Sequence, residues 1–474
     1  MSEKSMNRQK ELARNTMILT IGKICTQGIS FFLLPLYTAV LSPDEYGIVD
    51  LFNTYISVLL PLVNWEFDLG LFRFMLDARN SCDDQKRVFS TVVTANAFQI
   101  AVYLLLFLAI QPFVSSKYKL FLAFDVVLNV VLNTLLQFSR GLGRNGIYSF
   151  ASFLSASLTV VLNVILIAVF SFGVYGLFVA PVIAKVISIV LLILSQRAWT
   201  YYSIRCFSKE KLKQIFKYSF PLIPTQLSWW IVNASDRTIV TYFLGIALNG
   251  IYSVANKFSS LYITFYNIFN MSWTETVALH VNDDDRDEFL TSMFNTVFAM
   301  FSAICLGIIA CMPFVYPILI NEQYSSGYYQ VPILMIAVLF QVVCGLYSVI
   351  YLAVKKSAES AKTALYAAII NVVVDVVLIK MIGLYAASVS TLVAYATMAI
   401  CRYFDTQKYV KMLFNKRLLV VTIIVAIVDF GCVMYNNLFI TILNFFIVVI
   451  YAIWSNSELI SSCVKLIFAK IKRG

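Results

Sequence analysis

Four basic residues fall within long apolar segments of this 474-residue chain: Lys23, Lys185, Arg237 and Lys257. A charged side chain near the middle of a bilayer costs about 2.5 to 3.5 kcal/mol by insertion scales unless it is paired or hydrated, so such residues are candidates for function. Fixed cations that line a hydrated cleft replace part of the water around an anion such as a diphosphate. The four residues are therefore candidate binding groups for an anionic ligand.

Arg237 is the first candidate, and Lys257 has a similar depth. At about 1.5 Å per residue, both lie roughly 10 to 15 Å inside their segments, so they can face one cavity at a similar height. Lys23 and Lys185 lie nearer the ends of their segments, where a long side chain can reach the headgroups instead. The alternative for Arg237 and Lys257 is an internal ion pair that only holds helices together. The candidate acidic partners are Asp236, Asp50, Asp125 and Asp375.

The same acidic residues have a second interpretation, as binding sites for a coupling proton or sodium ion. Asp236 directly precedes Arg237, so we expect it to point to another side of the helix, toward Lys257 or Lys23. Most of the other acids lie within about two turns of a segment end, where solvation at the interface is the alternative. The acids that are candidates for coupling-ion binding, with solvation at the interface as the alternative, are Asp50, Glu66, Asp68, Asp125, Asp375 and Asp429.

The cysteine and histidine pattern argues against metal and thiol chemistry. Nine cysteines are scattered without a Cys-x-x-Cys pair, and His280 is the single histidine. Isolated thiols of this kind usually pack as small hydrophobes. Every connection that we predict on the outer side of the membrane is short, and the longest of these, residues 318–330, carries Glu322 as its single acid. We therefore expect no enzyme activity, no metal and no cofactor.

The elements that must position these residues are membrane-spanning helices. Hydrophobic residues make up 60% of the chain, charged residues 13%, and the mean hydropathy is +0.81. A span needs about 20 apolar residues, and the chain offers about fourteen such segments. The predicted spans are 15–40, 46–70, 88–112, 118–138, 147–171, 174–196, 218–244, 247–275, 290–317, 331–354, 361–380, 383–401, 418–435 and 438–454.

The basic residues predict the orientation of these spans. Of the 36 Lys and Arg residues, we assign 29 to the N-terminus, the C-terminus and the even-numbered connections, three to the other side and four to the spans. Connections rich in Lys and Arg stay in the cytoplasm, so both termini are predicted to be cytoplasmic. The three outward residues are Lys117, Lys119 and Lys380. Because the positive charge is spread over many short connections, it favours lipid headgroups as the anionic neighbour and argues against nucleic acid.

Two internal echoes indicate a repeated architecture. Residues 47–53 and 250–256 share Gly, Ile and Asn at an offset of 203 residues, so the turn between spans one and two resembles the turn between spans seven and eight. Residues 163–167 and 375–379 form a second pair, followed by Phe-Gly-Val-Tyr-Gly and Ile-Gly-Leu-Tyr-Ala. Six spans separate the copies, an even number, so the halves enter the membrane in the same orientation. This pattern predicts two six-helix lobes related by an axis along the membrane normal, with two further helices at the C-terminus.

The central part of the chain carries a family resemblance. Pro221-Leu-Ile-Pro-Thr-Gln-Leu-Ser-Trp-Trp, then Asn233-Ala-Ser-Asp-Arg237, then Asn249-Gly-Ile-Tyr252 and Ala255-Asn-Lys257 are its most specific residues. The chain resembles the oligosaccharide-lipid flippases of the multidrug/oligosaccharidyl-lipid/polysaccharide exporter superfamily. Span number and order extend the resemblance over the whole chain.

The resemblance implies a multi-pass protein of the bacterial inner membrane, with a cavity between two lobes. It implies that the substrate is a polyprenyl-diphosphate-linked oligosaccharide, the repeat unit of an O-antigen, capsule or exopolysaccharide. A polymerase and glycosyltransferases of the same pathway are implied partners, beside the membrane lipids. The predicted parts are an N-terminal lobe (1–196), a cytoplasmic linker (197–217), a C-terminal lobe (218–404), and two extra helices with a basic tail (405–474).

Two other functions stay open on the sequence. An ion-coupled efflux pump for cationic drugs, from the same superfamily, would favour an acidic cavity, whereas four in-span basic residues favour an anionic substrate. A membrane polysaccharide polymerase would favour a large external loop with paired Arg or acidic residues. Aromatic residues also have two interpretations, as interfacial belts or as surfaces on which sugar rings stack. Candidates for stacking are Trp229, Trp230, Tyr252 and Tyr266.

Overall fold

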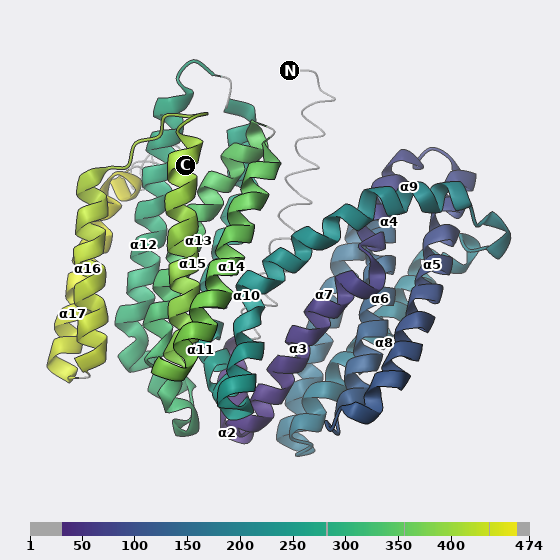
Figure 1. The fold of residues 1–474 in the computed structure, drawn as a ribbon, viewed down its shortest axis with the longest axis horizontal. Helices are drawn as coiled ribbons and strands as arrows, with labels where there is room; N and C mark the ends of the chain where they lie inside the picture. The colour runs from purple at the N-terminus through teal and green to yellow at the C-terminus, as the bar shows by residue number, and fades with distance from the viewer. Residues whose placement is uncertain (1–30, 281–282, 355, 436, 462–474) are drawn as a thin grey trace, which may run out of the picture. The chain divides into compact units, whose positions relative to one another are not determined.

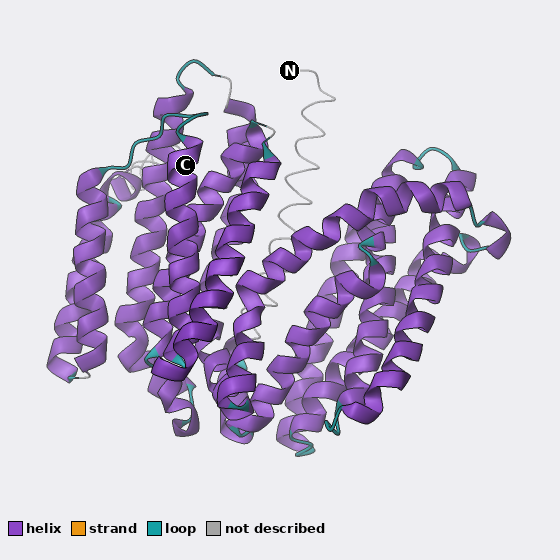
Figure 2. Cartoon of the chain, viewed as in Figure 1, coloured by secondary structure: helices purple, strands orange, loops and turns teal. Residues whose placement is uncertain are grey.

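The computed structural model describes residues 31–280, 283–354, 356–435 and 437–461, and all regular structure in this part is helical (Figure 2). Ten of the described helices are long and apolar enough to cross a bilayer. Three more have sufficient length, with 22, 35 and 22 residues: α10 (Ile223–Leu244), α11 (Ile246–His280) and α15 (Tyr385–Thr406). The predicted all-helical polytopic fold is confirmed, whereas most of the first predicted span lies outside the described residues.

The chain divides into two compact units, Met1–Trp230 and Ile231–Gly474. The boundary falls within α10. In the first unit, α7 packs along α8, and α6 packs against both α4 and α8. The described helices of this unit before α10 are α2 (Leu34–Val40), α3 (Pro43–Asn64), α4 (Phe67–Asp77), α5 (Cys82–Ile110), α6 (Lys119–Gly141), α7 (Asn145–Val164), α8 (Val174–Gln196) and α9 (Lys209–Ser219) (Figure 1).

The predicted linker, residues 197–217, contains most of α9, and α9 packs against α4 and α5. Ser208 caps this helix, because its hydroxyl accepts a hydrogen bond from the backbone N–H of Lys211. Gly70 of α4 permits the close approach, since a Cβ at this position would overlap the side chain of Ser219. In the structure this segment is thus packed onto the first unit, while the lobe boundaries proposed from the sequence stay a prediction.

The second predicted span, 46–70, is interrupted. Helix α3 starts at a capping box, in which Ser42 and Glu45 exchange side-chain and backbone hydrogen bonds. It ends at Trp65 and Glu66, two successive non-glycine residues with φ of 52° and 56°. Such left-handed conformations are uncommon for non-glycine residues, so the surrounding packing must hold them. The chain then continues as α4, whose Phe67, Leu71 and Met75 belong to the core of this unit.

In the second unit, α15 packs between α13 and α14, and α11 packs on α13. The last two helices, α16 and α17, pack on each other and on α12, beside that core. The helices that follow α11 are α12 (Arg286–Leu319), α13 (Gln330–Ala353), α14 (Ser357–Ile382), α15, α16 (Lys416–Tyr435) and α17 (Leu438–Ser455).

The connections of the first unit meet as the alternating topology requires. Arg79, which follows α4, donates hydrogen bonds to the carbonyls of Gly141 and Arg140 at the end of α6, at 2.8 and 3.1 Å. At the other end of the helices, the rings of Tyr118 and Tyr175 lie 5.2 Å apart. Within this unit, the connections that follow α4 and α6 therefore lie at one end of the helices. The connections that precede α6 and α8 lie at the other end.

The internal repeat is visible in the local backbone. The offset of 203 residues aligns the turn between α2 and α3 with the turn between α10 and α11. The second echo aligns Gly173, before α8, with Gly383, before α15. Their conformations are nearly the same, with φ and ψ of 54° and −132° at Gly173 and of 59° and −135° at Gly383. Only glycine adopts this region without strain, so each half places a glycine at the same structural turn.

Candidate functional site

A buried polar cluster lies within the second unit, where α10, α11, α14 and α15 approach one another. Asp236 of α10 is 3% exposed. The hydroxyl of Tyr252 on α11 donates a hydrogen bond to the Asp236 carboxylate. Asp236 therefore joins α10 to α11 in the interior of this unit.

Asn371 of α14 extends the cluster to α15. Its side-chain oxygen accepts a hydrogen bond from Ser235 at 3.4 Å, and its amide nitrogen donates to Ser390 and Thr391, each at 3.4 Å. Asn371 is fully buried. Three helices thus share one buried polar junction.

Asp375 lies one turn after Asn371 on α14, and its side chain is fully buried. Residues four apart on a helix lie on the same face, so Asp375 belongs to the face that carries Asn371. Neither of its carboxyl oxygens has a hydrogen-bond partner within the described part of the chain. A buried carboxylate is costly unless it is paired or protonated, so Asp375 is a candidate site for a cation or a proton.

Arg237 lies beside this cluster and is largely buried. Its side chain is 15% exposed, and one guanidinium nitrogen, Nη1, is 4.0 Å from Oδ1 of Asp236. The backbone N–H of Arg237 also donates to Oδ1 of Asp236 at 2.9 Å. Asp236 thus lies near Arg237 and also contacts Tyr252 on α11, the helix that carries Lys257, while a contact between Asp236 and Lys257 stays a prediction. Lys257 is partly buried on α11.

The first unit contains a separate ion pair. Nζ of Lys185 on α8 lies 2.5 Å from Oδ1 of Asp125 on α6, with the two side chains 15% and 13% exposed. Asn129 also donates a hydrogen bond to the Asp125 carboxylate, at 3.2 Å. Lys185 is thus neutralised by Asp125, and this pair ties α6 to α8. Asp50 is partly buried on α3, and Lys23 lies outside the described residues.

Three of the aromatic candidates for sugar stacking form hydrogen bonds within the structure. Tyr252 is fully buried and binds Asp236, and Tyr266 is 3% exposed with its hydroxyl donating to Asn270 at 3.0 Å. Trp230 donates from its ring nitrogen to the carbonyl of Thr54 at 3.0 Å. Buried rings that serve as hydrogen-bond donors leave no face for a sugar, so stacking by Tyr252 and Tyr266 is excluded in this conformation.

Sequence reasoning missed the polar partners Asn371, Ser235 and Thr391, and also Arg402. We expected Arg402 in a cytoplasmic connection, but it lies within α15 and is 1% exposed. Its guanidinium donates to the carbonyls of Cys344 and Ser360 and to the hydroxyl of Thr363, at 2.7, 3.1 and 2.9 Å. The spacing of Asn371 and Asp375 by four residues was the one sequence feature that pointed to a shared polar face.

Comparison with known proteins assigns the family. A family model described as "Polysaccharide biosynthesis protein" matches residues 12–274, more than half of the chain. The chain belongs to this family. A relative from Rhizobium meliloti (strain 1021), the succinoglycan biosynthesis transport protein ExoT, is 23% identical over 259 residues, which are 53% of this chain. The match spans about half the length of that relative.

Solved structures show the same fold. The lipid II flippase MurJ in an inward closed conformation aligns with a TM-score of 0.69 at 16% identity, over 94% of this chain and 100% of that protein. An inward-facing multidrug resistance MATE family transporter aligns with a TM-score of 0.68 at 14% identity, over 82% and 97% of the two chains. The family match agrees with the predicted role in polysaccharide biosynthesis, and the fold is that of solved transporters and flippases of the kind that the sequence resembles. The helices of membrane-spanning length make the chain a multi-pass membrane protein, and its relatives are described as a transport protein, a flippase and a transporter.

Proposed function

We propose that this protein moves a polyprenyl-diphosphate-linked oligosaccharide from the cytoplasmic to the outer leaflet of a bacterial inner membrane by alternating access. The family match to polysaccharide biosynthesis proteins supports the substrate class. In this proposal the lipid chain stays in the bilayer while the sugar diphosphate crosses through the protein. The observation that carries the proposal is the position of Arg237, a largely buried cation 4.0 Å from the carboxylate of Asp236.

Asp236 and Asp375 form the coupling site of this proposal. Asp236 has Arg237 beside it, so both carboxylates can stay charged only if a proton or a further cation compensates Asp375, because their desolvation and mutual repulsion add. When a sodium ion or a proton neutralises the pair, the attraction between Asp236 and Arg237 weakens. Arg237 then becomes available to hold the diphosphate, whose geometry suits a guanidinium. Ion binding and substrate binding are thus coupled through one carboxylate.

The membrane potential adds to the driving force. Moving an anion outward from a negative interior is downhill, by about 2.3 kcal/mol per charge for each 100 mV. A coupling cation that moves inward as the substrate moves outward gains energy from the same potential. The proposed cycle therefore requires no nucleotide.

A drug efflux function is the second candidate, and the unpaired carboxylate of Asp375 favours it, because a buried acid also suits a cationic drug. A strain that lacks the gene distinguishes the two functions. The flippase proposal expects loss of surface polymer and accumulation of carrier-linked oligosaccharide at the inner leaflet, both restored by the wild-type gene. Normal polymer together with increased sensitivity to cationic drugs would instead support efflux.

A further inference from the structure

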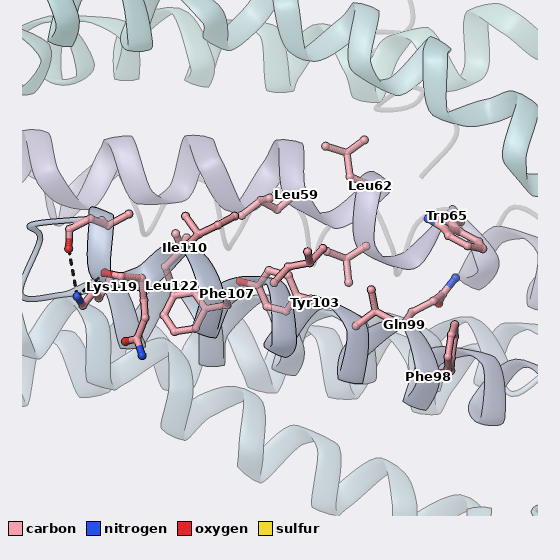
Figure 3. A pocket seen from close by; sticks show the side chains of 15 residues that line it. Leu59, Leu62, Trp65, Phe98, Gln99, Tyr103, Phe107, Ile110, Lys119 and Leu122 are labelled. Carbon is pink, nitrogen blue, oxygen red and sulfur yellow. Dashed lines mark hydrogen bonds between the residues drawn. The ribbon is translucent and has the colours of Figure 1, made fainter.

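An apolar groove runs along the first unit between α3 and α5 (Figure 3). Its volume is about 620 Å³, within the range of small-molecule sites. Leu59, Leu62 and Leu106 are among the residues that line its length. Figure 3 shows Lys119 at one end and Trp65 with Phe98 at the other, with the side chains of the two helices facing each other along one line.

The length of the groove matches one leaflet. From Phe98 to Ile110, α5 rises by about 18 Å, at about 1.5 Å per residue. Half of a hydrocarbon core is about 15 Å. A hydrocarbon chain that entered at the Lys119 end would therefore extend to about the middle of the membrane.

The charge at the groove mouth selects the kind of lipid. Nζ of Lys119 donates hydrogen bonds to the carbonyls of Gln111 and Val114, at 2.7 and 3.1 Å, which fix its position but leave its charge uncompensated. The ammonium of Lys117 lies 5.0 Å from the ring centre of Tyr118 and 5.8 Å from that of Tyr175. In the described part of the chain, neither lysine forms an ion pair with a carboxylate. The hydrogen bond between Lys117 and Tyr118 raises the pKa of Lys117, so this side chain is cationic at neutral pH.

These two lysines are also two of the three basic residues that we predict on the outer side. Exposed basic residues are scarce on that side of membrane proteins. A phosphate at the outer headgroup level would meet the ammonium of Lys119 at the mouth of the groove, with Lys117 two residues away in the same connection, and its hydrocarbon chain would lie in the groove.

We propose that this groove binds the polyprenyl phosphate or diphosphate carrier in the outer leaflet, with the phosphate at Lys117 and Lys119 and the isoprenoid chain between α3 and α5. A carrier of this kind has one chain for each headgroup, so the groove covers the isoprene units nearest the phosphate while the rest of the chain lies among the membrane lipids. A two-chain phospholipid would leave one chain outside. The inference rests on the proposed function, because it assigns the groove to the product that a flippase releases outward.

Photo-cross-linking from within the groove tests this proposal. A benzophenone amino acid replaces Leu106, which lines the groove, or Leu105, its neighbour on α5 that does not; both side chains are exposed, at 57% and 67%. The protein is placed in vesicles of phosphatidylcholine that contain either undecaprenyl phosphate or phosphatidylglycerol at the same mole fraction. Mass spectrometry then identifies the attached lipid.

We expect undecaprenyl phosphate to label position 106 several-fold more than position 105, and more than phosphatidylglycerol does. Lys117→Gln should reduce this labelling about fivefold, since one basic residue near the membrane surface contributes about that factor. Lys119→Arg should preserve the labelling, and Lys380→Gln, at the third outward lysine, should leave it unchanged.

Equal labelling at positions 105 and 106 would overturn the proposal. So would equal labelling by phosphatidylglycerol, a cross-link from position 106 to residues 1–30, or labelling that is insensitive to Lys117→Gln. If labelling fails while a strain lacking the gene still accumulates carrier-linked oligosaccharide, the groove proposal alone is wrong. If such accumulation is also absent, the proposed function is wrong as well.

Discussion

At the scale of single residues, Arg237 and Asp236 carry the central prediction. If Arg237 solvates the diphosphate, Arg237→Ala should abolish surface polymer while the protein stays inserted and abundant. Arg237→Lys should restore part of the export, because the charge returns without the planar guanidinium. Polymer export and protein level, measured together in the same cells, test this expectation.

The competing interpretation of Arg237 is a structural ion pair with Asp236, and it predicts a different pattern. Removing one partner of a buried pair leaves an uncompensated charge, so Arg237→Ala would lower the protein level and Arg237→Ala with Asp236→Asn would recover it. Normal export from Arg237→Ala at normal abundance would remove Arg237 from the mechanism under either interpretation.

Asp375 allows a test of ion binding that does not depend on transport. A cation that binds only the folded protein stabilises it, by about 2.7 kcal/mol at a concentration one hundred times the dissociation constant. We therefore expect the melting temperature of the purified protein to rise with sodium concentration, or to shift with pH when the ion is a proton. Asp375→Asn should abolish this response.

Asp429 of α16 provides the matched control for Asp375. It is also a fully buried carboxylate in the second unit, but Asn444 donates a hydrogen bond to it at 2.7 Å. Asp429→Asn should keep the sodium or pH response of the wild type. A response that survives in Asp375→Asn and disappears in Asp429→Asn would place the ion site between the last helices instead.

At the scale of elements, the Lys185–Asp125 pair ties α8 to α6. Lys185→Met should lower the free energy of unfolding by about 3 to 5 kcal/mol, because the remaining carboxylate is left largely buried without its cation. Lys185→Met with Asp125→Leu should regain most of that stability. Thermal unfolding in detergent measures both, and equal losses in the single and double variants would show that packing, and not charge, dominates this contact.

The repeated glycine turns before α8 and α15 give a second prediction at this scale. Gly173→Ala and Gly383→Ala should each destabilise the protein by about 1 to 3 kcal/mol, since φ near +55° with ψ near −135° is strained for alanine. Gly307→Ala in α12 is the control, because its added Cβ meets no atom within 4 Å and its backbone is helical. Losses that differ widely between Gly173 and Gly383 would argue against equivalent turns in the two halves.

At the scale of the whole molecule, the charge asymmetry predicts a topology. Single cysteines introduced into a variant without native cysteines should be labelled from the cytoplasmic side at residues 197–217 and 407–415, and from the outside at residues 115–118. An impermeant maleimide applied to intact cells measures this difference. Labelling of either basic connection from outside would reverse the predicted orientation and, with it, the leaflet assigned to the groove.

Sequence alone determined the class of this protein, because apolar runs of membrane-spanning length and the distribution of Lys and Arg are local properties that depend on the bilayer and not on the fold. The sequence also showed the internal similarity around residues 172–176 and 382–386, and the structure added that Gly173 and Gly383 have nearly the same backbone conformation. The sequence also identified the charged residues within the spans as candidates, because a charge within an apolar segment can be recognised whatever the arrangement of the helices.

Only the tertiary structure decided what those charges meet. Lys185 and Asp125 are 60 residues apart and form an ion pair, whereas Asp375 lies in a polar cluster without a partner in the described part of the chain. The break at Trp65 and Glu66, the burial of Arg402 and the groove between α3 and α5 likewise depend on how helices pack. Helix periodicity gives the face on which a side chain lies, but the neighbour of that face is set by contacts between distant segments, and these have no local pattern in the sequence.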